Sequence, residues 1–178
     1  MAIDDSLLTS SGTDSVQSVI LDWQNETIEL LQTSLDNSAS TGTSLKLRQS
    51  IQPRQLKQTE NGLLMVIEME DYYKYIDEGV RGVGGEKKGG GIFQQVAPNS
   101  PFSYKEGVKP SVKHFEQWAR TKGLNPFAVR ESVFRKGITP NHFFSNVMTD
   151  EWIGELSTRL ELVGANNIEI ILKNNLEQ

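Results

Sequence analysis

The stretch Arg81–Gly91, RGVGGEKKGGG, divides this chain into two parts of different character. Seven of the 15 glycines lie between Gly79 and Gly91. A long helical pattern and then strand-like patterns precede this tract, and helical patterns follow it. Between 79 and 107 nothing regular is expected beyond a short apolar run at 92–96, and loops of that length are usually functional or disordered. Because strands and helices segregate along the chain, the sequence predicts an α+β fold.

The first element is predicted to be one long amphipathic helix over residues 14–35. Its apolar side chains recur at helical spacing, and Asp14 with Gln17 forms a capping-box pattern. Residues 1–13 are expected to be a flexible segment, and 14–178 a single domain with a mobile loop at 79–107. Three acidic residues share the helix face opposite the apolar stripe: Asp22, Glu26 and Glu29.

Charge is distributed unevenly. The net charge is −5, which argues against a general nucleic-acid binder. Residues 1–40 hold seven acids and no Lys or Arg, whereas the other 138 residues hold 18 basic and 16 acidic groups. The acidic helix indicates either an ordinary solvated face, or a surface for self-complementary assembly or for repelling DNA.

Composition excludes several classes of protein. The chain has no cysteine, so disulfides, thiolate metal sites and cysteine nucleophiles are all excluded. Its longest apolar runs, at 63–67 and 170–172, are far shorter than the roughly 20 residues of a membrane helix. We therefore expect a soluble protein without membrane contact.

A small antiparallel sheet is expected to follow the first helix and to pack against it. Leu45, Leu47 and Ile51 fit one face of a first strand. Asn61-Gly62 marks a turn, and the unbroken apolar run in 63–69 predicts a strand buried on both faces near its start.

The C-terminal part is predicted to be helical, with clear boundary signals. Pro110 is expected at the start of a first helix that Gly123 ends. Asn125-Pro126 is expected to begin a second helix, which Gly137 ends, and Asp150 and Glu151 suit the N-terminus of a last helix. The segment 168–172, IEIIL, fits a strand or a helix equally well.

The glycine tract does not fit a known phosphate-binding motif. A phosphate-binding loop requires a lysine and then a hydroxyl residue after its glycines, but here the lysines precede the glycine triplet and Ile92 follows it. The dinucleotide fingerprint would need a third glycine where Lys87 stands. We interpret the tract as a slack strap that contacts a partner through Arg81, Gly82, Gly84, Gly85, Lys87, Lys88, Gly89, Gly90 and Gly91.

No enzymatic chemistry is predicted. The two histidines, His114 and His142, lack the spacing of a metal site, and the acids Glu68, Glu70 and Asp71 fit the solvent face of a strand. No nucleophile elbow is present. We expect neither catalysis nor a cofactor or metal.

Two stretches, YYKYIDEGVRG (72–82) and VRESVFRKGITPNHFFSNV (129–147), resemble the tail-completion and minor tail proteins of tailed bacteriophages, the small head–tail connector family. The matching positions in the first stretch are Tyr72, Tyr75, Ile76, Asp77 and Gly79. Those in the second are Val133, Gly137, Ile138, Pro140, Phe143 and Phe144. The resemblance covers most of residues 14–165.

This resemblance implies a structural virion protein, assembled in the bacterial cytoplasm, at the neck or the head-proximal end of the tail. It implies a homo-oligomeric ring, commonly a hexamer, with a dodecamer also open. Such a ring contacts neck and tail-tube proteins, and DNA passes through its lumen without specific binding. The acids Asp22, Glu26 and Glu29 would line the lumen, and the loop 79–107 would order against a neighbour. Two alternatives stay open: a nucleotide- or nucleic-acid-binding module that uses the Gly/Lys loop, and a phage assembly chaperone.

Overall fold

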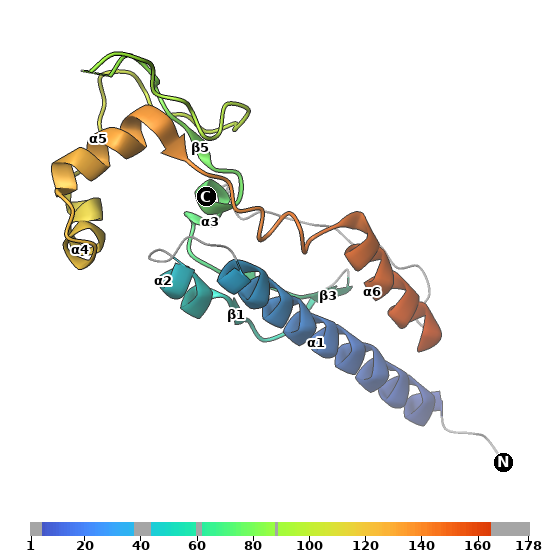
Figure 1. Ribbon diagram of the computed structural model, residues 1–178. Helices are drawn as coiled ribbons and strands as arrows, with labels where there is room; N and C mark the ends of the chain where they lie inside the picture. The colour runs from blue at the N-terminus through green and yellow to red at the C-terminus, as the bar shows by residue number, and fades with distance from the viewer. Residues whose placement is uncertain (1–4, 38–43, 60–61, 88, 165–178) are drawn as a thin grey trace.

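The computed structural model of the protein describes residues 5–37, 44–59, 62–87 and 89–164 (Figure 1). The fold is α+β, with a long N-terminal helix, short antiparallel strand pairs and C-terminal helices. The chain forms two parts. Residues 79–138 make up one of them, which we name the arm, and the other described residues form the body. Asn61, Lys88 and the segment 168–172, which carried predictions, lie outside the described residues.

The body is built along helix α1 (Asp5–Asn37), and helix α6 (Asp150–Leu162) lies beside it (Figure 1). The helix begins at Asp5, so it includes residues 5–13 and starts before Asp14, the predicted N-cap. One hydrophobic cluster joins the two helices through the buried residues Ile20, Trp23, Leu156 and Leu160.

Polar contacts hold α1 and α6 in one register. The rings of Trp23 and Trp152 stack with centroids 5.6 Å apart. The Thr27 hydroxyl is fully buried, donates to the Trp23 carbonyl at 2.7 Å and accepts from the Trp152 indole Nε1 at 2.9 Å. The Trp23 indole in turn donates to the Trp152 carbonyl at 3.3 Å. These directional hydrogen bonds set the orientation of the Trp152 indole against α1. Burial of the ring alone would not set that orientation.

Helix α2 (Ser44–Ser50) replaces the first strand that the sequence predicts. Leu47 and Ile51 are both fully buried, and their spacing of four residues places them on one side of a helical turn. The alternation of Leu45 with Leu47 suggested a strand, but burial against α1 decided the conformation. These residues complete a second hydrophobic cluster of Ile28, Leu31, Leu35, Leu47, Ile51 and Phe143.

The strands are shorter than predicted and form separate pairs. In place of one strand over 63–69, the chain forms two, and none of the side chains from 63 to 69 is fully buried. Gln24 of α1 holds the adjoining segments by donating from Nε2 to the carbonyls of Arg54 and Val66, at 3.2 and 2.8 Å. The antiparallel pairs are β1 (Gln52–Pro53) with β4 (Ile67–Glu68), and β2 (Lys57–Thr59) with β3 (Gly62–Leu64).

The arm leaves the body after helix α3 (Tyr73–Asp77). It contains helices α4 (Lys113–Thr121) and α5 (Pro126–Lys136), which pack as a hairpin at one end of the molecule (Figure 1). Its strands β5 (Val80–Arg81) and β6 (Gly137–Ile138) pair antiparallel. Neither hydrophobic cluster of the described residues includes a residue of the arm, which is therefore packed separately.

The boundary signals of α5 and α6 are confirmed. The Asn125 side chain accepts from the Phe127 N–H at 2.9 Å, Pro126 is the first helical residue, and Gly137 follows the last turn. Helix α6 begins at Asp150, capped by Thr149. Helix α4 begins at Lys113, three residues after Pro110. Among the described residues no helix is long and apolar enough to span a membrane.

Candidate functional site

The two sequence stretches that carry the phage-protein resemblance meet at the base of the arm. The buried Asp77 carboxylate accepts from the backbone N–H groups of Phe144 at 2.7 Å and Ser145 at 3.1 Å, and from the Ser145 hydroxyl. The Asn141 and His142 N–H groups donate to the Asp77 carbonyl at 3.1 and 2.9 Å. Asp77 thus fixes both the exit and the return of the chain.

Three glycines allow two backbones to touch at this base. A Cβ on Gly82 would overlap the Arg135 carbonyl and the Gly137 nitrogen, and one on Gly137 would overlap the Val80 carbonyl. A Cβ on Gly79 would press on the Ile138 carbonyl. We name this contact between 79–85 and 134–138 the glycine seam. Its role is close backbone approach, which only glycine permits.

Hydrogen bonds along the seam give the first half of the glycine tract fixed contacts. The N–H groups of Val83 and Gly84 donate to the carbonyls of Phe134 and Arg135, at 3.0 and 2.9 Å. The Arg135 guanidinium donates to the Gly84 carbonyl at 3.1 Å. Residues 79–85 therefore differ from the irregular, slack strap that the sequence predicts.

The second half of the glycine tract is an exposed turn. Glu86 and Ile92 form an antiparallel bridge, and Lys87 and Gly91 are hydrogen-bonded at 2.9 Å. A Cβ added at Gly89, Gly90 or Gly91 would meet no atom within 4 Å. Residues 92–112 contain no helix, so the helix N-terminus that a phosphate-binding loop needs does not follow this tract.

The aromatic residues of the motifs serve several contacts. Tyr72 packs against the cluster that contains Phe143, and Phe143 is fully buried. Tyr75 is exposed, with its ring edge-on to Phe102 of the arm at 4.6 Å. Tyr73 lies against Phe144 at 5.2 Å. The aromatic residues around 72–75 thus contact both the body and the arm.

The three acids proposed to line a lumen lie in different surroundings. Asp22 and Glu29 are exposed on α1. Glu26 instead makes a two-pronged ion pair with Arg159 of α6, at 3.0 and 2.8 Å, and the hydrogen bonds from Arg159 lower the pKa of Glu26. Its charge is neutralised within the chain. No pattern in the sequence indicates Arg159 as its partner.

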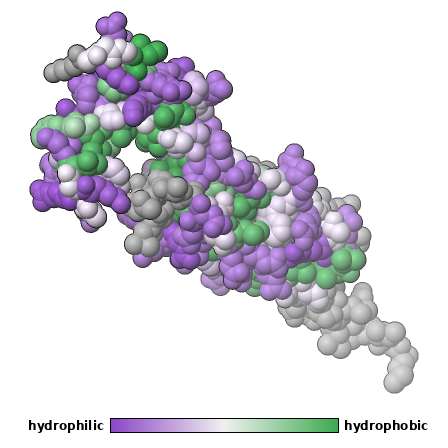
Figure 2. Space-filling model, in the orientation of Figure 1, coloured by the Kyte–Doolittle hydropathy of each residue, from purple (hydrophilic) through white to green (hydrophobic). Residues whose placement is uncertain are grey.

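Exposed apolar residues gather at the turn of the α4–α5 hairpin, a surface we name the hairpin tip. Trp118, Leu124 and Phe127 are 40%, 49% and 60% exposed. Trp118 and Phe127 recur with other apolar residues at helical spacing, but such periodicity does not show which apolar residues the chain itself covers. Figure 2 shows hydrophobic residues on the surface at this end of the molecule. Basic residues adjoin the tip: Arg120, Lys122 and Arg130.

A groove of about 320 Å³ lies between α1 and the start of α6. Its apolar lining includes Leu30, Val147 and Trp152, and its acids are Glu151 and Glu155. The Glu151 pKa is lowered by its own backbone N–H and by the Thr149 hydroxyl, so the carboxylate is charged at neutral pH. We name this surface the α1–α6 groove.

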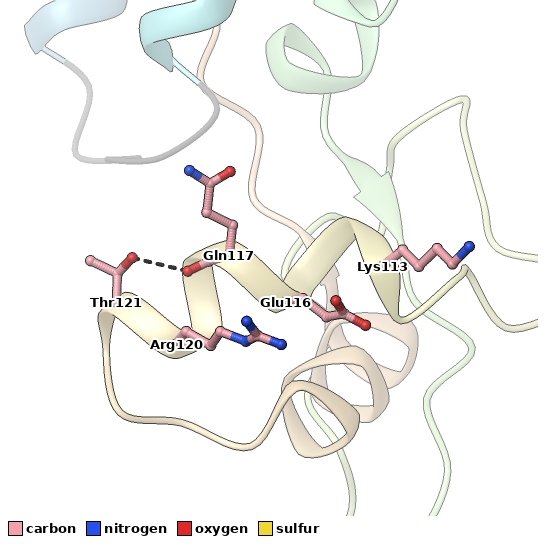
Figure 3. A pocket seen from close by; sticks show the side chains of 5 residues that line it. All are labelled: Lys113, Glu116, Gln117, Arg120 and Thr121. Atoms are coloured by element: carbon pink, nitrogen blue, oxygen red, sulfur yellow. Dashed lines mark hydrogen bonds between the residues drawn. The ribbon is translucent and has the colours of Figure 1, made fainter.

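A second hollow, of about 370 Å³, lies along the polar side of α4 (Figure 3). All five residues that line it come from α4 itself: Lys113, Glu116, Gln117, Arg120 and Thr121. The Thr121 hydroxyl donates to the Gln117 carbonyl at 2.9 Å. Among the described residues no second element lines it, so the hollow lacks there the enclosure that small-molecule sites share.

Charge separates between arm and body. The arm carries 11 Lys and Arg against 4 Asp and Glu, a net charge of +7. The rest of the chain carries 7 against 19, a net charge of −12, and the two parts together give −5. Within the described residues no group of three or more His, Asp or Glu could hold a metal ion. No family model, curated protein or solved structure matches this chain.

Proposed function

We propose that this protein is a non-enzymatic structural component of a tailed-phage particle. In this role it forms a ring, commonly of six copies, at the neck or the head-proximal end of the tail. It joins neck and tail-tube proteins and surrounds DNA without binding it specifically. The finer assignment, terminator or completion protein, depends on position in the particle and is left open.

One observation carries the proposal. The two stretches that resemble the connector family, 72–82 and 129–147, lie far apart in sequence, yet they build one unit at the base of the arm. Asp77 bonds to Phe144 and Ser145, and Gly79 and Gly82 pack on 135–140. Because these residues depend on one another to form the junction, proteins of the connector family would carry them together. The presence of both stretches in this chain therefore supports the resemblance.

The acidic face of α1 fits passage of DNA. Asp22 and Glu29 are exposed, and exposed carboxylates repel phosphates, which keeps a polyanion from adhering. Glu26 is removed from this role because Arg159 neutralises it. The exposed tip 86–92 of the glycine tract is the segment proposed to meet a neighbouring protein.

The test is mass spectrometry of density-purified particles from a phage that encodes this chain. We expect the chain in mature particles at a small fixed copy number, six or twelve. A phage protein known to act only in the cytoplasm serves as the control for carry-over. Absence of the chain from particles, together with its presence on assembly intermediates, would overturn the proposal in favour of an assembly chaperone.

A further inference from the structure

We propose that the hairpin tip of one copy docks into the α1–α6 groove of a second copy, so that subunits meet head to tail. This inference rests on the proposed ring function and specifies how its neighbouring subunits would make contact. The inserted residue is Phe127, which is the most exposed of the three apolar residues of the tip.

The hairpin tip has the chemistry of a docking element. Trp118, Leu124 and Phe127 lie within the last turn of α4, the connection and the first turn of α5, so three large apolar groups share one turn. Isolated apolar residues on a surface are ordinary, but contiguous ones mark contact sites. The Arg130 guanidinium lies 5.5 Å from the Phe127 ring centroid, so the aromatic group carries a cation beside it.

The α1–α6 groove has the matching chemistry. Leu30 and Trp152 offer apolar surface for an aromatic ring, and the carboxylate of Glu151 can receive a cation that accompanies it. Glu155 adds a second carboxylate to the groove, which is already hydrogen-bonded to Arg159 at 2.7 Å. Leu30 follows Glu26 by one helical turn, and Glu155 and Glu26 both bond to Arg159, so the groove borders the acidic face of α1.

A second copy is the occupant that the charges favour. The arm is strongly basic and the rest of the chain strongly acidic, so arm-to-body contact is attractive and arm-to-arm contact is repulsive. The hairpin and α6 lie at opposite ends of the molecule, so the tip does not reach its own groove (Figure 1). A contact between two different surfaces is heterologous, and such contacts close into rings when the rotation permits.

Sedimentation of the full-length chain over a concentration series tests the contact. We expect wild-type protein to self-associate, more strongly at low salt. Phe127→Ala should weaken association about tenfold or more, as loss of a central aromatic contact does. Val108→Ala, which truncates an exposed apolar residue elsewhere in the arm and outside the loop 79–107, is the matched control and should change nothing.

Charge reversal tests the pairing of surfaces. Arg120→Glu with Lys122→Glu reverses the hairpin, and Glu151→Lys with Glu155→Lys reverses the groove. Each double variant alone should stay monomeric, and an equimolar mixture should associate, because each reversed surface then meets its complement. Circular dichroism checks that both are folded. Lys113→Glu with Lys136→Glu, at the ends of α4 and α5 away from the turn, controls for reversal of arm charge outside the hairpin tip.

Several outcomes would overturn the inference. These are a wild-type chain that is monomeric up to about 1 mM, equal association of the Phe127→Ala and Val108→Ala variants, or a mixture of the reversed variants that does not associate. If reversing Arg120 and Lys122 abolishes binding of single-stranded oligothymidylate but leaves association unchanged, the tip is a nucleic-acid surface instead. None of these results concerns the presence of the chain in particles, so this contact and the proposed virion role fail separately.

Discussion

Asp77 and Phe144, which flank the whole arm in sequence, are joined by a short hydrogen bond, 2.7 Å from the Phe144 nitrogen to a carboxylate oxygen. Only 3% of Asp77 is exposed, and the same carboxylate also receives the N–H and hydroxyl of Ser145. The connection between body and arm is therefore made by one buried anion that serves several donors.

Replacing Asp77 should destabilise the fold strongly. Asp77→Ala removes the acceptor of the Phe144 and Ser145 N–H groups and of the Ser145 hydroxyl at a partly buried junction, and we expect a loss of about 1–3 kcal/mol in the free energy of unfolding. Asp77→Asn keeps one acceptor oxygen and should lose less. Urea unfolding measures both, with Glu78→Ala, an exposed neighbour, as the control. A loss equal to that of the control would contradict the assigned role of Asp77.

Alanine substitutions should distinguish the glycines that the seam requires from those that could be replaced without loss of stability. Gly82→Ala and Gly137→Ala force a Cβ into backbone atoms that have no free space, so we expect each to cost more than about 2 kcal/mol. Gly89→Ala meets no atom within 4 Å and should change stability by no more than about 1 kcal/mol, in the stabilising direction. Thermal unfolding of the three variants side by side makes the comparison, and similar midpoints would count against the seam.

The Glu26–Arg159 pair should make part of the stability pH-dependent. Because the pKa of Glu26 is lower in the folded chain than its ordinary value, the stabilisation is present above the ordinary pKa and is lost as pH falls through the folded pKa. The pair is partly exposed, so its contribution is at most about 1 kcal/mol.

The check is the difference in unfolding free energy between pH 7 and pH 3. This difference should be smaller in Glu26→Gln than in wild type. Glu29→Gln, on the exposed face of the same helix, serves as the matched control. An unchanged difference in Glu26→Gln would show that Arg159 does not stabilise the folded carboxylate.

Nucleotides should leave the protein unaffected. The first half of the glycine tract is bonded to 134–136, and no helix begins at the end of the tract. A ligand present at 100 times its dissociation constant would raise stability by about 2.7 kcal/mol. We expect no change in melting temperature at millimolar ATP or GTP with magnesium. A concentration-dependent rise would instead support the nucleotide-binding alternative.

The extent to which sequence predicted this fold depended on whether the signal was local. Asn125, Pro126 and Gly137 set the bounds of α5 through their own caps and backbone preferences, so these boundaries were predictable. At 45–51 a local alternation predicted a strand, but Leu47 and Ile51 are buried together against α1 as a helical pair. Tertiary packing overrode the pattern there.

The base of the arm could not be predicted, because its partners are distant in sequence. Gly82 and Gly137 carry no sign of their mutual contact, and Asp77 carries no sign of the N–H groups that it accepts. The resemblance singled out Asp77, Gly79 and Gly137 without giving a physical reason for them. The structure supplies that reason, since all three shape one junction between backbones.

The junction at Asp77 also means that the arm begins and ends at one point, since Asn141 donates to the Asp77 carbonyl at 3.1 Å. The arm is a segment whose two ends are already in contact, so its length adds little to the loop-closure entropy of the rest of the chain. Because both hydrophobic clusters lie outside it, the arm can change in length or sequence while the body keeps its packing. A protease cut at the 86–92 tip would, for the same reason, leave two fragments that remain associated.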